Sequence, residues 1–132
     1  MIVDSSALVA ILTEEVDAVI LNRVIARAAS CAISAPTLLE TSMVLSGRRG
    51  QAPIDALDAY LLKANIAILP FTTDHARLAR DAFLRYGKGR HKAGLNFGDC
   101  IAYATARLEA MPLLFKGDEF ALTDVEVAHP VG

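Results

Sequence analysis

The chain is poor in cysteine and histidine and has no long hydrophobic run. Cys31 and Cys100 form no Cys-x-x-Cys pair and stand in apolar surroundings, so we interpret them as reduced core residues. The longest apolar run near the N-terminus, 7–12, is too short to cross a membrane, and no basic region precedes it. We therefore expect a cytoplasmic protein.

The chain also lacks net positive charge, because 15 acidic residues outnumber 13 lysines and arginines and leave a formal charge of −2. This balance argues against a general nucleic-acid coat protein. Basic residues are nevertheless concentrated in 77–92, where six of them accompany a single acid, Asp81. A phosphate backbone would respond to that local excess, and without the acidic residues described below a solvated helix face that continues into a loop would be the preferred explanation.

The length of 132 residues predicts a single domain, 1–132, that can bury a core without disulfides. Hydrophobic residues make up 54% of the chain, which is high for a soluble protein of this size. We therefore expect an apolar surface that a partner covers, either a second copy or a companion chain.

Segments with the pattern of strands alternate with segments of helical spacing. Such an order predicts an α/β fold with a mainly parallel sheet of four to five strands, covered by helices on both faces. The predicted strands are 2–3, 31–34, 67–71, 112–115 and 125–127, and the predicted helices are 5–12, 16–29, 37–45, 53–66, 73–86 and 99–109. Turns rich in glycine and basic residues are predicted at 47–50 and 87–94.

Four acidic residues stand where the predicted buried segments end. Asp4 and Asp118 come directly after strands, whereas Glu40 and Asp99 fall in the first turns of predicted helices. All four can meet at the carboxyl edge of a parallel sheet, where ligands bind in such folds. Because carboxylates are rarely buried unless they are paired or bound to a metal, this placement predicts one shared cation site.

The ligand types favour magnesium or manganese over zinc, because they are oxygen atoms without paired cysteines or histidines. The three histidines, 75, 91 and 129, have no spacing suited to a metal and are predicted to lie on the surface. A hard divalent ion can activate water and stabilise a leaving oxygen, which indicates phosphodiester hydrolysis. Basic residues at the rim would admit a polyanionic strand; the candidates are Arg48, Arg49, Lys88, Arg90 and Lys92.

Each acid also has a purely structural interpretation. Asp4 can cap the first helix, and Glu40 or Asp99 can complement a helix dipole in a first turn. Asp118 can be an ordinary turn residue. Ser6 can serve as a second capping hydroxyl or can orient a water bound to the metal.

Taken together, four motifs resemble those of the PIN-domain ribonucleases, specifically the VapC-type toxins. They are Met1-Ile2-Val3-Asp4-Ser5-Ser6-Ala7-Leu8, Glu40 after Ala35-Pro36, Leu95-Asn96-Phe97-Gly98-Asp99-Cys100, and Leu113-Leu114-Phe115-Lys116-Gly117-Asp118-Glu119-Phe120 with Thr123-Asp124. The match spans the chain in the right order. The resemblance implies a three-layer α/β/α sandwich, magnesium-dependent endonucleolytic cleavage of RNA with Mn²⁺ as a substitute ion, a homodimer, and neutralisation by a VapB-type antitoxin.

The same resemblance assigns roles to individual residues. Asp4, Glu40 and Asp99 match the acidic core that the family uses for metal, and Ser6 matches its small hydroxyl residue. Many PIN domains place the fourth acid where this chain has Gly117, so Asp118 is ranked first for that role and Glu119 is its alternative. Asn96 belongs to the matching motif with a supporting hydrogen bond. In this scheme water attacks the phosphate in line and leaves a 5′-phosphate and a 3′-hydroxyl.

Two other functions fit parts of the pattern. A phosphoacceptor or phosphatase domain also gathers aspartates around magnesium, but it would need an aspartate at Leu69-Pro70-Phe71 or at Ser6. A catalytically silent PIN-like binding module would not need to keep Asp4, Glu40 and Asp99. Acyl-phosphate formation would identify the first alternative, and stabilisation by added metal would argue against the second.

Overall fold

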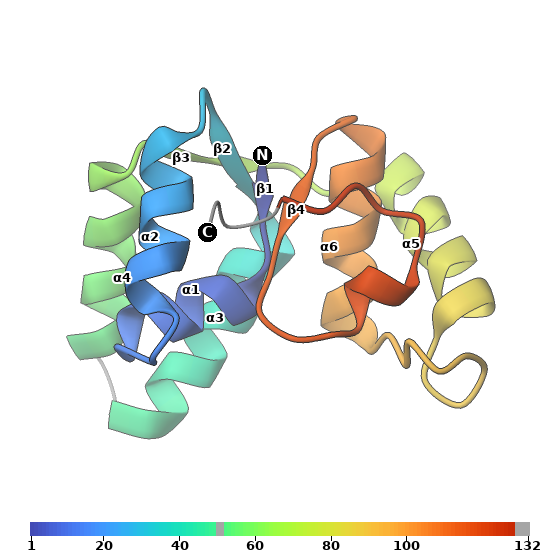
Figure 1. Ribbon diagram of the computed structural model, residues 1–132, viewed down its shortest axis with the longest axis horizontal. Helices are drawn as coiled ribbons and strands as arrows, with labels where there is room; N and C mark the ends of the chain where they lie inside the picture. The colour runs from blue at the N-terminus through green and yellow to red at the C-terminus, as the bar shows by residue number, and fades with distance from the viewer. Residues whose placement is uncertain (50–51, 129–132) are drawn as a thin grey trace.

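The computed structural model describes residues 1–49 and 52–128, without the side chains of Arg48, Arg49 and Ala52. Within these residues, helices and strands follow one another as the sequence predicts (Figure 1). Their order is β1 (Ile2–Val3), α1 (Ser5–Leu12), α2 (Ala18–Arg27), β2 (Cys31–Ser34), α3 (Ala35–Arg49), α4 (Ala52–Lys63), β3 (Ile66–Leu69), α5 (Thr73–Tyr86), α6 (Phe97–Leu108), β4 (Leu113–Leu114) and a 3-10 turn, η1 (Phe120–Leu122).

The four strands form a parallel sheet in the order β3-β2-β1-β4. Ile2 lies between Ala32 of β2 and Leu113 of β4, so the N-terminal strand occupies the interior of the sheet. The predicted strand 125–127 contributes one parallel bridge, between Leu113 and Val127. The predicted α/β fold with a mainly parallel sheet is therefore confirmed.

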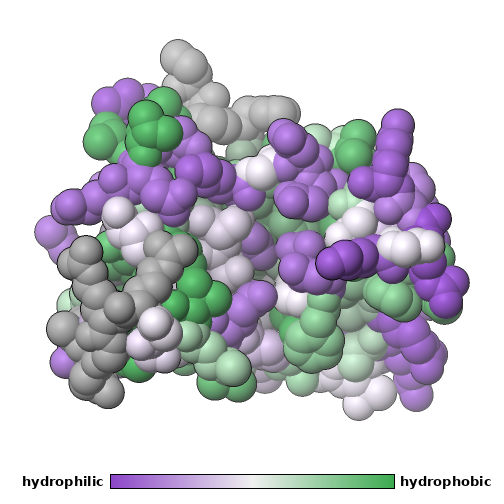
Figure 2. Space-filling model, turned by 90° about the horizontal axis from the view of Figure 1, so that it is seen from below, coloured by the Kyte–Doolittle hydropathy of each residue, from purple (hydrophilic) through white to green (hydrophobic). Residues whose placement is uncertain are grey.

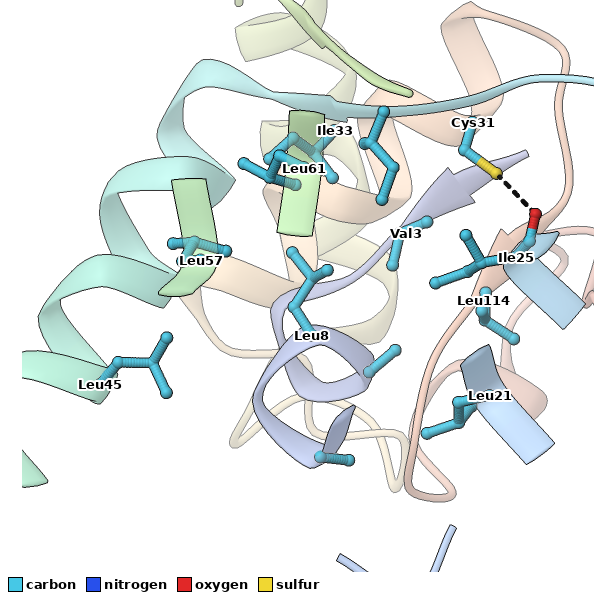
Figure 3. Packing of buried hydrophobic residues seen from close by; sticks show 13 residues of the cluster. Val3, Leu8, Leu21, Ile25, Cys31, Ile33, Leu45, Leu57, Leu61 and Leu114 are labelled. Atoms are coloured by element: carbon cyan, nitrogen blue, oxygen red, sulfur yellow. Dashed lines mark hydrogen bonds between the residues drawn. The ribbon is translucent and has the colours of Figure 1, made fainter. Parts of the chain in front are cut away.

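Helices cover both faces of this sheet, which makes a three-layer sandwich. α1 to α4 lie on one side and α5 and α6 on the other (Figure 1). The first core packs side chains such as Val3, Leu8 and Ile33 between the sheet and α1 to α4 (Figure 3). The second core packs Tyr103 and Phe120 on the opposite face. β1 alternates between the two, because its successive side chains point to opposite faces.

The helix α3 begins without a loop after β2 and runs further than the sequence predicts. The Ser34 Oγ accepts a hydrogen bond from the Thr37 N–H at 3.3 Å and so satisfies one of the first N–H groups of the helix. The helix continues to Arg49, so the turn predicted at 47–50 is wrong for 47–49 and Glu40 lies in the second turn rather than the first. Burial of Thr41 and Leu45 outweighs the local preference of glycine for a turn.

The surface prediction for His75 is also wrong. This residue is buried at the start of α5, where its Nδ1 accepts the Thr72 N–H at 3.0 Å and closes a capping box. The capping role explains its burial, because the first N–H groups of a helix need acceptors from outside the helix. In the described part of the chain, no helix has both the length and the apolar character needed to span a bilayer.

Candidate active site

Asp4 is the most deeply buried acid of the four, with 3% of its surface exposed. It follows β1 and caps α1, because the Ser6 N–H donates to its Oδ2 at 3.0 Å. The Ser6 hydroxyl donates to the same oxygen at 2.6 Å. Burial raises the pKa of Asp4 to about 7; the Ser6 hydrogen bonds act against this shift, and the charges of Asp99 and Glu40 add to it.

Asp99 lies in the first turn of α6, three residues after the cap residue Asn96. The Asp99 N–H donates to Asn96 Oδ1 at 2.8 Å, and the Asn96 N–H donates to Asp99 Oδ2 at 3.0 Å. This reciprocal capping box gives Asn96 the supporting hydrogen bond expected of it. Burial raises the pKa of Asp99; the hydrogen bond from Asn96 opposes the shift, whereas the charges of Glu119 and Glu40 reinforce it.

Glu40 approaches the same helix terminus from α3. Its carboxylate lies so close to Gly98 that a Cβ on that residue would be 1.9 Å from Glu40 Oε2. Gly98 immediately precedes Asp99, and the carboxylate therefore lies against the first turn of α6. Glu40 and Asp99 are thus neighbours in the fold, although 59 positions separate them in the sequence.

The two candidates for the fourth acid differ in their relation to this group. Asp118 and Glu119 are both exposed. Glu119 turns back over Gly117, where a Cβ would be 2.6 Å from Glu119 Oε2, and its charge helps to raise the pKa of Asp99. Asp118 is not among the groups that shift the pKa of Asp99 or Asp4. The charge of Glu119 therefore acts on the acidic group through Asp99.

The acids share the carboxyl edge of the sheet, but their side chains are not arranged as a set of metal ligands. Among the side chains that the structure describes, no three aspartates, glutamates, cysteines or histidines are arranged to hold a metal ion as they stand. Asp4 and Asp99 are each engaged by a neighbour in their own helix, Ser6 or Asn96. The donor set still fits a hard divalent ion, because neighbouring carboxylates that repel one another are stabilised by a cation between them.

The basic loop 87–94 begins and ends next to this edge. Its base is closed by the Lys88 N–H, which donates to the Leu95 carbonyl at 2.9 Å, one residue before the cap Asn96. Lys88, Arg90 and Lys92 are exposed on the loop. Figure 2, which views the molecule from below, shows hydrophilic residues over much of that face. The side chains of Arg48 and Arg49 lie outside the described residues.

Two charged residues of the fourth motif, Lys116 and Asp124, were given no individual role by the sequence prediction. Lys116, directly before Gly117, donates its backbone N–H to the Ser6 Oγ at 3.0 Å. Asp124 accepts a hydrogen bond from the Tyr103 hydroxyl, and its Oδ2 forms an ion pair with Arg107 Nη1 at 3.2 Å. These contacts attach the segment that contains Asp124 to α6. Both contacts depend on distant segments, so no local pattern in the sequence could have indicated them.

Comparison with known proteins identifies the family to which this fold belongs. The family model described as the PIN domain matches residues 1–126, and the chain belongs to this family. It is 47% identical over 129 residues to the protein named Ribonuclease VapC of Mycolicibacterium smegmatis, an alignment that covers 98% of this chain and 100% of the relative.

Solved structures support the same fold. The Mycobacterium tuberculosis VapC20 structure, titled a sarcin-ricin loop cleaving toxin, has a TM-score of 0.74 at 24% identity and covers 96% of this chain and 97% of its own. A toxin-antitoxin complex from Klebsiella pneumoniae has a TM-score of 0.70 at 19% identity, with 98% of each chain covered. At these identities the likeness concerns the fold.

Proposed function

We propose that this chain is a metal-dependent endoribonuclease and the toxin of a type II toxin-antitoxin system. The observation that supports it best is the buried Asp4, whose carboxylate shares one edge of a PIN-domain sheet with Glu40 and Asp99. The 47% identity to a protein named Ribonuclease VapC supports the substrate class and the toxin role. The proposed site of action is the cytoplasm, where RNA is available to a toxin. Residues 1–132 are proposed to act as one domain.

In this proposal Asp4 and Asp99 bind Mg²⁺ and Glu40 binds it directly or through water. The ion, when bound, supplies an activated water and stabilises the charge that develops during phosphodiester hydrolysis. Ser6 holds the Asp4 carboxylate in one orientation through two hydrogen bonds to Oδ2. Asn96 does the same for Asp99 while it caps α6. Water attacks in line and leaves a 5′-phosphate and a 3′-hydroxyl.

The fourth acid is Glu119 in this proposal, and Asp118 becomes its alternative. Many PIN domains carry an acid where this chain has Gly117, and the Glu119 carboxylate reaches the space that a side chain at 117 would fill. Its charge acts on Asp99. Glu119, two positions after Gly117, thus supplies the carboxylate that Gly117 lacks.

The RNA strand enters over the basic loop. Lys88, Arg90 and Lys92 are exposed beside the α6 N-terminus and would neutralise phosphates that the acids repel. The Arg90 Cζ also lies 5.3 Å from the centroid of the Phe83 ring, which holds the guanidinium against α5. Arg48 and Arg49 remain predicted members of this rim.

A VapB-type antitoxin is the partner that we assign to α2 and α4. The chain exposes apolar side chains at Val16, Val19 and Leu62, of which Val16 is 90% and Leu62 84% exposed. A groove between the two helices contains Tyr60 and Asn22, joined by a hydrogen bond of 2.6 Å. An amphipathic segment that covers these residues would meet both apolar surface and polar groups. The likeness of the fold to a chain of a toxin-antitoxin complex is consistent with this role.

A second apolar face is assigned to a homodimer. Leu39 and Met43 of α3 lie next to Phe97 of α6, whose side chain is 83% exposed, and the three line one depression with Glu40. Burying this face against a second copy would remove the exposed phenylalanine from water. It would also bring the two acidic sites of a dimer close to one interface.

The function is tested by incubating the purified chain with total bacterial RNA and Mg²⁺ and sequencing the new ends. We expect discrete cleavage sites with 5′-phosphates, abolished by EDTA and by Asp4→Asn or Asp99→Asn. Full activity of either variant would contradict the assignment of the site. Formation of a stable acyl-phosphate with a phosphodonor would support the phosphatase alternative, and absence of both cleavage and metal binding would support a silent binding module.

A further inference from the structure

A short hydrogen-bonded chain connects β4 to the most buried acid. The backbone N–H of Lys116 donates to the Ser6 Oγ at 3.0 Å, and the Ser6 hydroxyl donates to Asp4 Oδ2 at 2.6 Å. A hydroxyl oxygen that accepts a fixed N–H has its own hydrogen directed away from that donor. The peptide of residue 116 therefore selects the Ser6 rotamer that points at Asp4.

The side chain of the same lysine is held by two acids. Its Nζ lies 2.8 Å from Glu15 Oε1 and 3.6 Å from Asp17 Oδ2, both in the connection between α1 and α2. The other Glu15 oxygen lies 3.2 Å from the Thr13 hydroxyl, whose single hydrogen is shared with the Val9 carbonyl at 2.7 Å. Lys116 thus joins the end of β4 to the segment that follows α1.

We propose that Lys116 is a positioning residue for Asp4, because its ion pairs with Glu15 and Asp17 hold the peptide N–H that orients the Ser6 hydroxyl. The inference rests on the proposed function, since the orientation of Asp4 matters for a metal ion that Asp4 binds. Hydrogen bonds of this kind, one step behind a metal ligand, commonly control metal affinity.

The contact is poorly explained by stability alone. The Lys116 side chain is 34% exposed and its acidic partners are exposed to a similar extent, and such partly exposed ion pairs contribute little to folding. Lys116 also follows Phe115 at the end of the short strand β4, where no further strand residues hold the backbone. A side-chain tether at this point fixes a segment that the sheet no longer holds.

The test compares Lys116→Met with Lys116→Arg, which keeps the charge, and with Lys63→Met, which removes an exposed lysine from α4. Three quantities are measured in the full chain: hydrogen exchange of the residue-116 amide by NMR, the Mn²⁺ concentration that gives half-maximal thermal stabilisation, and cleavage of total bacterial RNA. For Lys116→Met we expect faster exchange and a rise of about tenfold in the Mn²⁺ concentration. The other two variants should match the wild type.

Unchanged amide exchange and an unchanged Mn²⁺ midpoint in Lys116→Met would overturn the inference. A lower midpoint would also overturn it, because it would mean that the lysine competes with the ion. If the wild type bound Mn²⁺ but cut no RNA, the proposed function would fail while the Mn²⁺ titration still decided the role of Lys116. A wild type that Mn²⁺ does not stabilise would overturn both.

Discussion

The carboxylate of Glu40 occupies the space in which a side chain at Gly98 would begin, with 1.9 Å between Oε2 and the position of a Cβ. Gly98 lies in the first turn of α6, one residue before Asp99. An acid from α3 can therefore approach Asp99 only because residue 98 has no side chain. The glycine is required by the site rather than by the helix, which would accept alanine at this position.

Replacing Gly98 by alanine should separate activity from stability. The new methyl group would displace the Glu40 carboxylate, so we expect RNA cleavage to fall about tenfold or more. The free energy of unfolding should fall little or rise, because alanine is favoured over glycine in helices by up to about 1 kcal/mol. Gly47→Ala is the matched control, since a Cβ there meets nothing within 4 Å. Equal activity of both variants would refute the role of Gly98.

The fourth acid can be identified with two adjacent isosteric variants. Glu119→Gln should weaken Mn²⁺ binding and slow RNA cleavage, because the Glu119 charge acts on Asp99. Asp118→Asn should leave both quantities close to wild type, although the residue is equally exposed. Mn²⁺ titration by thermal shift and initial cleavage rates measure the two effects. If Asp118→Asn had the larger effect on Mn²⁺ binding and cleavage, Asp118 would be the fourth acid instead.

Stability of the metal-free chain should fall as the pH rises from about 4 to 7. The pKa of Asp4 is raised from 3.8 to about 7, so the folded state binds more protons than the unfolded state in this window. Asp99 adds a slope of the same sign, because burial raises its pKa too. The slope is on the order of 1 kcal/mol per pH unit for one such group.

This pH dependence is measured by chemical denaturation in EDTA at several pH values. Asp4→Asn should flatten the slope, because asparagine does not titrate. Asp58→Asn, which alters an exposed carboxylate on α4, serves as the control and should keep the wild-type slope. A wild-type chain that became more stable between pH 4 and 7 would contradict the burial of a protonated Asp4.

The basic loop should govern the salt dependence of RNA binding. Simultaneous replacement of Lys88, Arg90 and Lys92 by alanine removes up to three phosphate contacts, so the slope of log K against log salt should decrease by about 2. Binding is measured with catalytically inactive Asp99→Asn as the background, to prevent cleavage. Arg77→Ala, at the other end of α5, is the control. An unchanged slope in the triple variant would exclude the loop from the RNA path.

The pattern of apolar segments was sufficient for the fold. The strand 31–34 and the helix after Thr72 are found where periodicity and capping residues predicted them. The predictions failed where burial outweighed local preference, as in α3, which continues through Gly47, and at His75, which caps α5 from the interior. Local signals do not report how a segment packs.

For the candidate site, the sequence by itself determined that Asp4 follows a strand and that Asp99 opens a helix, because apolar patterns and capping residues are local signals. Only the tertiary structure decided how they relate to one another. It set Glu40 against Gly98, placed the Glu119 carboxylate over Gly117, and linked Lys116 to Asp4 through Ser6. These relations depend on distances between side chains of different elements, and such distances arise only when the elements pack.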